Sequence, residues 1–292
     1  MHSSPEPLSR TTEPIDPSFV FDFRAYDEPD AVDQRWSTWH DVEPLCRGPE
    51  PRPDWVITSR AAVDTELGIL KTGKEADVFL LERAVDGGPS VVMAAKRYRD
   101  TDHRNFHRNA AYTEGRRGRD SREARAAAKG TKFGRAVAAG QWANAEWDSL
   151  KLCWNLGLPV PYPVQIDGTE LLMEWITVGS AEDRQTAPRL AQTRPDADLL
   201  ASYFVQLREA MATMAQHGIV HGDLSAYNLL AAGERLVIID LPQVVDLVGN
   251  PQGMDFLLRD CANVCAWFRG KGLDPAVADE HTLFGDLLAT AF

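Results

Sequence analysis

Cysteine is scarce in the sequence, and long hydrophobic runs are absent from it. The 292 residues include four Cys, no two of which form a Cys-X-X-Cys pair, so neither a disulfide framework nor a zinc-ribbon site is expected. No apolar stretch approaches the ~20 residues that a membrane helix needs. The polar, proline-containing start does not resemble a secretory signal. These absences predict a cytoplasmic protein that makes no contact with a membrane.

Basic residues are also in the minority, with 31 Lys and Arg against 43 Asp and Glu. The resulting net charge of −12 disfavours a general nucleic-acid-binding protein. The distribution is uneven, because the segment 96–135 holds thirteen basic and five acidic residues. Two interpretations of this basic segment stay open. One is a solvated, mobile loop over residues 104–125, and the other is a contact with an anionic partner near a ligand cleft.

The composition of the chain changes along its length. Residues 1–18 are rich in Pro, Ser, Thr and acidic residues, which predicts a disordered tail. Residues 19–57 contain Phe19, Phe21, Phe23, Tyr26, Trp36 and Trp39. Because so many aromatic residues are unusual in a free tail, we expect an N-terminal extension that lies against the folded body. The remaining residues, 58–292, carry the predicted strands and helices.

The order of these predicted elements indicates an α+β fold with two lobes. Three strands (TELGILK, ADVFLLERA and VVMAAKRYR) come first, and a helix is expected over Arg135–Asn155. The segment PVQIDGTELLMEWI predicts a hairpin that turns at Asp167-Gly168. A long helix, Asp196–His217, then precedes a loop, two short strands around Leu229 and Val237–Asp240, and a helical tail. We expect a small antiparallel N-terminal lobe with one helix, a mostly helical C-terminal lobe and a ligand cleft between them.

The loop after the long helix carries the strongest chemical signal. The block His221–Asn228 (HGDLSAYN) places Asp223 five residues before Asn228, and Asp240 follows at the end of an apolar strand. Phosphoryl transfer needs a carboxylate to orient the attacking hydroxyl and oxygen ligands for the divalent ion on the phosphates. Taken singly, Asp223 and Asn228 are better explained as turn formers, and Asp240 as the end of a strand. Their combination predicts Asp223 as catalytic base, with Asn228 and Asp240 as metal ligands.

A lysine on the third predicted strand supplies the expected phosphate contact. Lys96 follows a run of small apolar residues, so its side chain can point into the cleft and meet the α- and β-phosphates. Glu146, on the predicted helix that follows, is the best candidate for its ion-pair partner. The alternative is a solvated lysine at a strand end.

The loop Lys71, Thr72, Gly73, Lys74, Glu75 and Ala76 lies where a phosphate-covering loop is expected. Residues 68–74 also satisfy the Walker A spacing. A Walker loop is excluded because Glu75 replaces the hydroxyl that should reach Mg²⁺, and because the next residues predict a strand. Without a following helix there is no N-terminal helix dipole to bind phosphate.

Taken together, these motifs resemble the RIO kinase family. The segments TGKEADVF, AAKRYR, MEWI, HGDLSAYNLL, IIDLPQ and LLRDCANV occur in the order and spacing of that family from about Ile57 to Phe268. The absence of a winged-helix segment before them favours the first RIO subfamily. The resemblance implies a trimmed protein-kinase fold, with an N-lobe over about 58–173, a hinge over 174–178 and a C-lobe over 179–292.

The resemblance also implies roles for individual residues and for partners. It implies binding of ATP and of Mg²⁺ or Mn²⁺, with nucleotide contacts from the 71–76 loop, Val78, Lys96, Glu146, Met173, Glu174 and Ile176. It implies serine/threonine kinase activity with Asp223, Lys96 and Asp240 as catalytic residues. It further implies self-phosphorylation of the metal-binding aspartate, an ATPase switch on maturing ribosomal subunits, and ribosomal RNA as the partner of the basic segment.

The chain departs from ordinary protein kinases at several positions. Gly222 replaces the Arg that reads a phosphorylated activation loop, and Leu241 and Pro242 follow Asp240 where Phe-Gly is usual. Ala226 occupies a place that is often acidic in the RIO family. Two alternative functions stay open: a small-molecule phosphotransferase of the aminoglycoside or choline kinase type, and an inactive module that binds ATP only as structure.

Overall fold

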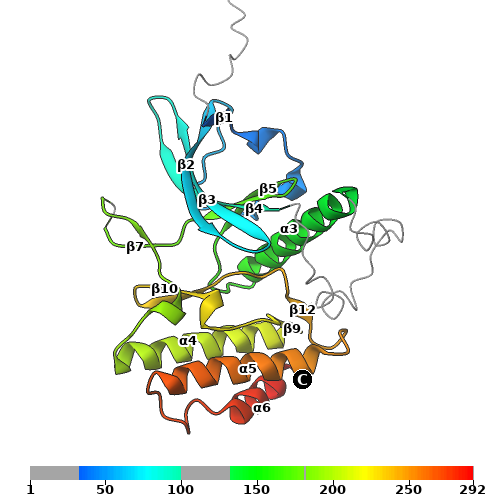
Figure 1. Ribbon diagram of the computed structural model, residues 1–292, viewed down its shortest axis with the longest axis vertical. Helices are drawn as coiled ribbons and strands as arrows, with labels where there is room; N and C mark the ends of the chain where they lie inside the picture. Colours follow the sequence, from blue (N-terminus) through cyan, green and yellow to red (C-terminus); the bar gives the residue numbers. More distant parts are fainter. Residues whose placement is uncertain (1–32, 100–131, 181, 292) are drawn as a thin grey trace, which may run out of the picture.

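The computed structural model describes residues 33–99, 132–180 and 182–291. These residues form two lobes, drawn one above the other in Figure 1. The upper lobe is an antiparallel sheet with one long helix, and the lower lobe is mostly helical with three small two-stranded sheets. The two-lobed α+β fold predicted from the sequence is therefore confirmed. The predicted tail 1–18 and the predicted loop 104–125 lie outside the described residues.

The N-terminal lobe is built on one six-stranded sheet in the order β1-β2-β3-β4-β6-β5. Every neighbouring pair in it is antiparallel. The strands are β1 (Gln34–Trp36), β2 (Ala62–Thr72), β3 (Ala76–Val85), β4 (Ser90–Tyr98), β5 (Pro163–Asp167) and β6 (Glu170–Glu174). The sheet thus joins the three predicted strands, the predicted hairpin, and a strand from the N-terminal extension that the sequence did not predict.

Tight turns and two irregularities shape this sheet. Gly168 has a positive φ of 58° in the turn between β5 and β6, where a side chain would be strained. Strand β2 shifts register against β3 between Glu66 and Gly68 and again between Ile69 and Lys71. Such bulges bend a strand and increase its twist. The second shift reaches Lys71, where the 71–76 loop begins.

Helix α3 (Lys132–Asn155) packs against this sheet and carries the predicted partner of Lys96. Ala139, Ala143, Trp147 and Leu150 are buried at helical spacing, which produces an apolar stripe toward the core. The helix ends where Gly157 takes a positive φ of 74°. The predicted helix is confirmed and begins three residues earlier than expected.

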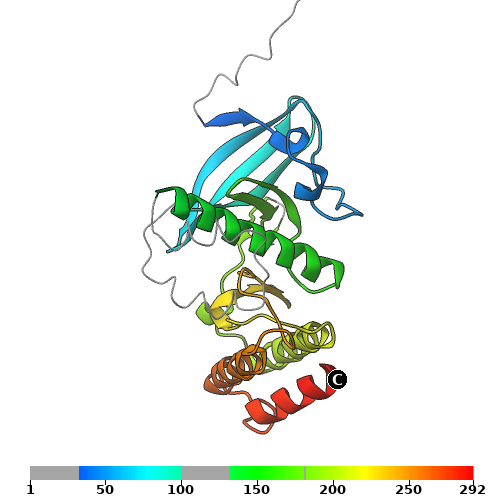
Figure 2. The same ribbon diagram turned by 90° about the vertical axis from the view of Figure 1, so that its right-hand side faces the viewer.

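The C-terminal lobe contains three helices, α4 (Ala197–Gln216), α5 (Gly253–Gly270) and α6 (Glu280–Ala291). Asp196 caps α4 by accepting a hydrogen bond of 2.9 Å from the amide of Leu199, and Gly218 follows the helix with a positive φ of 69°. Helix α6 lies below α4 and α5 and packs against both (Figure 2). The long amphipathic helix and the helical tail were both predicted.

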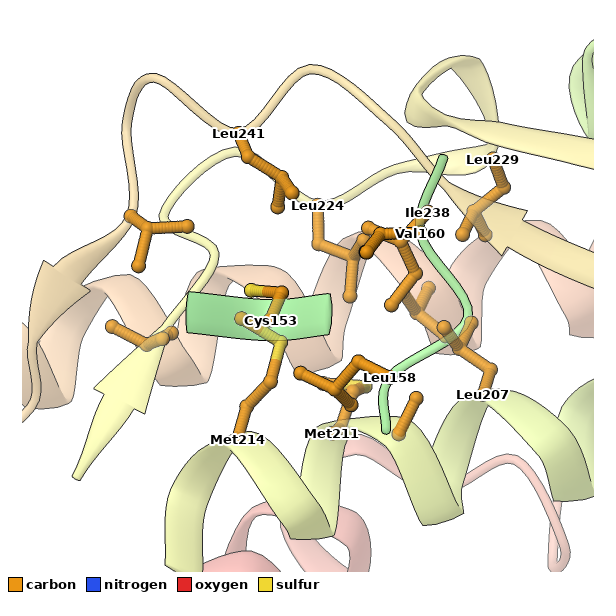
Figure 3. Packing of buried hydrophobic residues seen from close by; sticks show 14 of the residues in the cluster. Cys153, Leu158, Val160, Leu207, Met211, Met214, Leu224, Leu229, Ile238 and Leu241 are labelled. Atoms are coloured by element: carbon orange, nitrogen blue, oxygen red, sulfur yellow. The ribbon is translucent and has the colours of Figure 1, made fainter. Parts of the chain in front are cut away.

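Short paired strands lie between the N-terminal sheet and the helices of the C-terminal lobe and are called the floor of the site here (Figure 1). They are β7 (Thr177–Val178) paired with β8 (Gln185–Thr186), β9 (Ile219–Val220) paired with β12 (Val245–Asp246), and β10 (Leu229–Ala232) paired with β11 (Arg235–Ile238). Figure 3 shows how this floor is anchored, with Leu224, Leu229 and Ile238 packed above Leu207 and Met211 of α4. Apolar packing on this scale fixes the backbone of the predicted catalytic loop.

The N-terminal extension, in its described part, lies against the sheet. Strand β1 pairs with β2, and the short 3₁₀ helices η1 (Thr38–His40) and η2 (Pro44–Cys46) follow it. Trp39 is buried in a second core cluster with Leu81, Met93 and Tyr162. In the described ranges, no helix combines the length and the hydrophobicity required to cross a membrane.

Candidate active site

The predicted catalytic loop runs from β9 to β10 and is attached to α5 by its backbone. The amides of Gly222 and Leu224 donate hydrogen bonds of 2.8 and 2.9 Å to the two carboxylate oxygens of Asp260. Arg259, the neighbouring residue on α5, donates to the carbonyl of Gly222. Gly222 has a positive φ of 84°, which only a residue without Cβ adopts readily. The loop around Asp223 is thereby fixed, while the Asp223 side chain itself is exposed.

Burial changes the acidity of both carboxyl groups at this loop. It raises the pKa of Asp260 to about 7, although the two backbone amides favour the ionised form. Although Asp223 is exposed, the surrounding protein shields part of its carboxyl group from water, and this partial burial raises its pKa against the opposing charges of His221 and Arg259. A carboxylate with a raised pKa is a better proton acceptor, as a catalytic base requires.

The amide of Asn228 is oriented by the same loop. Its Nδ2 donates a hydrogen bond of 2.8 Å to the carbonyl oxygen of Asp223. Since the nitrogen makes this bond, the amide oxygen is the atom that can serve as a metal ligand. The side chain is nearly buried on the short helix η4 (Ala226–Asn228), so it needs no large movement to do so.

The sequence predicted that Asp240 ends a strand over Val237–Asp240. In the structure β11 ends at Ile238, and Asp240 lies two residues beyond it. Its backbone has a positive φ of 68°, which makes it the single non-glycine residue of that kind in the described ranges. This conformation is uncommon for a residue with a side chain and is often found at functional sites. It turns the carboxylate toward the N-terminal lobe.

Lys96 contacts two carboxylates, one from each lobe. Its Nζ lies 2.7 Å from the carboxylate of Glu146 on α3 and 2.8 Å from Oδ1 of Asp240. The Glu146 side chain is 2% exposed and that of Asp240 is 43% exposed. Asp240 is therefore the partner that a ligand entering the cleft can reach.

These contacts determine the charge states at the centre of the site. The Lys96 ammonium lowers the pKa of Asp240 to about 2, outweighing the effect of burial. Burial works against the charge of Lys96, but Asp240 and Glu146 raise its pKa well above the ordinary value. The centre of the site thus holds an ionised lysine between two carboxylates. An anionic phosphate and a cation can compete for these partners.

The 71–76 loop forms a tight turn between β2 and β3. The amide of Gly73 donates a hydrogen bond of 3.0 Å to the carbonyl of Ala76, and a Cβ on Gly73 would lie 2.7 Å from that oxygen. Lys71 at the start of the loop contributes to the low pKa of Asp240. Its own pKa is lowered by burial and by the charge of Arg189.

Other nucleotide-contacting candidates lie along β3, β6 and the segment between the lobes. Val78 is paired with Lys96 across β3 and β4, and Met173 is paired with Ala94. The amide of Glu174 donates a hydrogen bond of 2.9 Å to the carbonyl of Tyr162. Ile176 is buried in a small cluster with Val237 of β11. The structure therefore groups Lys96, Glu146 and Asp240 in direct contact, whereas Met173, Glu174 and Ile176 line the connection between the lobes.

Asn228 and Asp240 are the residues that could hold a divalent ion. In the part of the chain that the structure describes, no group of three or more His, Cys, Asp or Glu side chains forms a metal cluster. One carboxylate and one amide oxygen suit Mg²⁺, which keeps its other positions for water and phosphate. The ionised state of Asp240 is consistent with this donor set.

Comparison with known proteins identifies the family. A family profile described as the RIO domain matches residues 84–282. The RIO-type serine/threonine-protein kinase Rio1 of Haloferax volcanii is 36% identical over 222 residues, which is 76% of this chain and 68% of the relative. The chain belongs to the RIO family of serine/threonine kinases.

Two further comparisons are with RIO kinases that match at lower identity. The serine/threonine-protein kinase rio1 of Dictyostelium discoideum is 32% identical over 48% of this chain but only 24% of its own length. The crystal structure of the Rio2 kinase from Chaetomium thermophilum superimposes with a TM-score of 0.50 at 20% identity, covering 77% of this chain and 63% of that one. This structural likeness supports the two-lobed fold.

Two residues of this RIO kinase site were not predicted from the sequence as functional. Asp260 belongs to the segment LLRDCANV, but nothing local marks it as the residue that holds the catalytic loop. Tyr98 follows Lys96 by two positions, so both side chains lie on the same face of β4. Its hydroxyl donates a hydrogen bond to Oε2 of Glu146. A period of two from Lys96 is the signal that could have indicated Tyr98.

Proposed function

We propose that this RIO kinase transfers the γ-phosphoryl group of ATP to the hydroxyl of a serine or threonine side chain, with Mg²⁺ or Mn²⁺. The observation that supports this activity is the contact of Lys96 with Asp240 across the cleft, beside a catalytic loop fixed by Asp260. Because phosphoryl transfer depends mostly on positioned charge, a preorganised lysine and carboxylate are the main requirement.

Each residue then has a defined part in the reaction. Asp223, exposed on its loop, orients the attacking hydroxyl and accepts its proton. Lys96 contacts the α- and β-phosphates while Glu146 holds its ammonium group in place. Lys71, whose pKa is lowered by burial and by Arg189, is a second cation for the phosphate chain.

Asn228 and Asp240 would hold the divalent ion through their oxygen atoms. The ion neutralises charge on the phosphate oxygens when it is bound. The chain's own contribution is orientation: Asn228 is fixed by its bond to the Asp223 carbonyl, and Asp240 is fixed by its backbone conformation.

The test is incubation of the purified protein with γ-labelled ATP and Mg²⁺, followed by separation of acid-stable and acid-labile protein phosphate. Acid-stable label on serine or threonine, absent from Asp223→Ala, is the expected result. No label and no ADP from the wild-type protein would refute the proposed activity. A parallel panel of aminoglycosides and choline tests the alternative small-molecule phosphotransferase.

A second activity is favoured by the chemistry of Asp240, and we propose it beside the first. Its carboxylate is ionised and partly exposed at the cleft. An Asp240 oxygen attacks the γ-phosphorus, ADP leaves with the electron pair of the broken bond, and water later releases phosphate and restores the carboxylate. The two steps together hydrolyse ATP, which is the reaction that an ATPase switch requires. Acid-labile label that is lost in Asp240→Asn is the expected result.

We further propose that the basic segment 96–135 contacts ribosomal RNA. Lys96, Arg97 and Arg99 are paired with carboxylates, but the ten basic residues between 100 and 135 support an electrostatic contact without sequence specificity. Residues 100–131 lie outside the described ranges. Deleting residues 104–125 should weaken RNA binding at fixed salt and leave ATP binding unchanged. Equal RNA affinity of the two proteins would contradict this proposal.

A further inference from the structure

A short part of the N-terminal extension lies between the edge of the sheet and α3. This segment, Pro44–Gly48, is called the strap here and contains η2. It is part of the blue chain that Figures 1 and 2 show beside α3 and β5. Its two ends differ in what they contact, one end reaching the helix and the other the sheet.

The helix side of the strap contact involves the carbonyl of Leu45. Trp147 Nε1 donates to this oxygen at 3.1 Å, and Lys151 Nζ lies one helical turn further on and donates at 3.3 Å. The residue Trp147 is buried, whereas Leu45 is 78% exposed. At Leu45 the strap therefore contacts α3 through a backbone oxygen, while the next residue, Cys46, packs half-buried against the main core cluster.

The sheet side of the strap is attached to β5. The amide of Gly48 donates a hydrogen bond of 2.8 Å to the carbonyl of Val164, and Arg47 forms an isolated β-bridge with Gln165. A Cβ on Gly48 would lie 2.1 Å from the carbonyl oxygen of Pro163, so the approach requires glycine.

A further contact lies just beyond the strap, where Tyr162 Oη donates to the carbonyl of Pro49 at 2.9 Å. β5 is an edge strand, and the strap uses part of that edge.

Trp147 connects the strap to the active site, because it lies next to Glu146 on α3. Trp147 is the neighbour of Glu146, whose carboxylate contacts Lys96 at 2.7 Å. A rotation or shift of α3 by about one ångström would separate that pair, and misplacement on this scale costs on the order of 10²-fold in rate in other enzymes. The strap joins α3 to the sheet that carries Lys96, and so it holds the two members of the pair at a fixed separation.

We propose that the strap is a positioning element for phosphoryl transfer, acting through Trp147 and Lys151 on the Lys96–Glu146 pair. The proposal rests on the proposed kinase function. Residues of the N-terminal extension thereby contribute to catalysis from outside the segment that matches the RIO domain. Trp147 and Lys151 are positioning residues, because both donate to the Leu45 carbonyl of the strap and would act on the Lys96–Glu146 pair only through α3.

The test removes both donors to Leu45 in the full-length chain, as W147F/K151M. A ring is kept at position 147, which limits the volume lost from the core. We expect kcat to fall about five- to tenfold while KM for ATP changes less than about twofold. The matched control is Trp154→Phe on the same helix, which makes the same chemical change at a ring that packs on Tyr162. The control should keep its kcat.

A double-mutant cycle separates positioning from general damage to the fold. If the strap acts through Glu146, W147F/K151M should have almost no further effect on kcat in a Glu146→Gln background. An equal reduction in both backgrounds, or an unchanged kcat in the wild-type background, would refute the proposal.

Hydrogen exchange of the α3 amides provides a measurement independent of turnover. Amides around Glu146 should exchange faster in W147F/K151M than in the wild type and in Trp154→Phe. Equal exchange in the three proteins would also overturn the role of the strap. Absence of any phosphoryl transfer by the wild-type protein would refute the proposed function instead, and the exchange measurement would still decide about the strap.

Discussion

The ammonium group of Lys96, on β4 of the N-terminal lobe, lies 2.8 Å from the carboxylate of Asp240 in the C-terminal lobe. Both groups are ionised, since each shifts the pKa of the other toward its charged form. In the proposed mechanism a nucleotide replaces this contact, with Lys96 turning to the phosphates and Asp240 to the metal. The ion pair therefore holds the site in the charge state that the nucleotide uses.

Replacing Lys96 tests whether the charge that it contributes to the Lys96–Asp240 pair is needed for catalysis. Lys96→Met should lower kcat by on the order of 10²-fold or more, since it removes the charge on the phosphates. Glu146 keeps the hydrogen bond from Tyr98, so the fold should survive, which circular dichroism can check. Arg60→Met, at an exposed position in the same lobe, is the control. A turnover equal to that of the wild type would remove Lys96 from the reaction.

Tyr98 should matter for both stability and rate. Tyr98→Phe deletes the hydroxyl that donates to Glu146, and a hydrogen bond to a charged group contributes about 1.5–3 kcal/mol. We expect a loss of that size in urea unfolding, together with a lower kcat. Tyr227→Phe is the control, because Tyr227 is 64% exposed. Equal midpoints for Tyr98→Phe and the wild type would contradict the prediction.

The pH dependence of the rate should report Asp223. Burial raises the pKa of this carboxyl above its ordinary value of 3.8. The base must be ionised to accept a proton, so kcat/KM should fall with decreasing pH through the raised pKa. The acid limb should therefore lie at a higher pH than for a free aspartate, in a profile measured between about pH 4 and 8. An acid limb at the ordinary value would argue against Asp223 as base.

Asp260 should make stability fall as pH rises. Its pKa is about 7 in the folded protein against an ordinary value of 3.8. Between these values the folded state binds more protons than the unfolded state, so this group contributes stability at low pH that is lost as pH increases through about 7. Urea unfolding at several pH values should show this slope, and Asp260→Asn should flatten it. A slope that persists in the variant would assign it to other groups.

Nucleotide should stabilise the protein only when Asp240 is intact. At a hundredfold excess over Kd, a ligand adds about 2.7 kcal/mol, which corresponds to a rise in Tm of about 5 °C or more for a chain of this size. ATP with Mg²⁺ should produce this shift in the wild type. The shift should be much smaller with Asp240→Asn, or when EDTA removes the metal. An equal shift in all three cases would contradict metal binding by Asp240.

The sequence predicted the parts of the site that are close together along the chain. Asp223 and Asn228 share one loop, and Lys96 lies near the end of a recognisable strand, so local spacing was sufficient to propose them. Asp260 is different, because its importance comes from amides 36 and 38 residues away. Such contacts depend on how α5 packs, which no local pattern records.

The N-terminal extension shows the same limit. Its aromatic residues indicated contact with the folded body, and Trp39 is indeed buried. The pairing of β1 with β2 and the carbonyl contact of Leu45 with Trp147 could not be predicted. Backbone carbonyls are identical in every residue, so their partners leave no trace in the sequence.

The attachment of the catalytic loop to α5 has a consequence for how nucleotide enters and leaves. Gly222 and Leu224 are bonded to Asp260, and apolar packing on α4 holds the loop from below. The backbone of this loop is therefore held in place, and we expect the two lobes to open about the predicted hinge, near Glu174 and Ile176. Product release would then be governed by this hinge and not by rearrangement of the loop that carries Asp223.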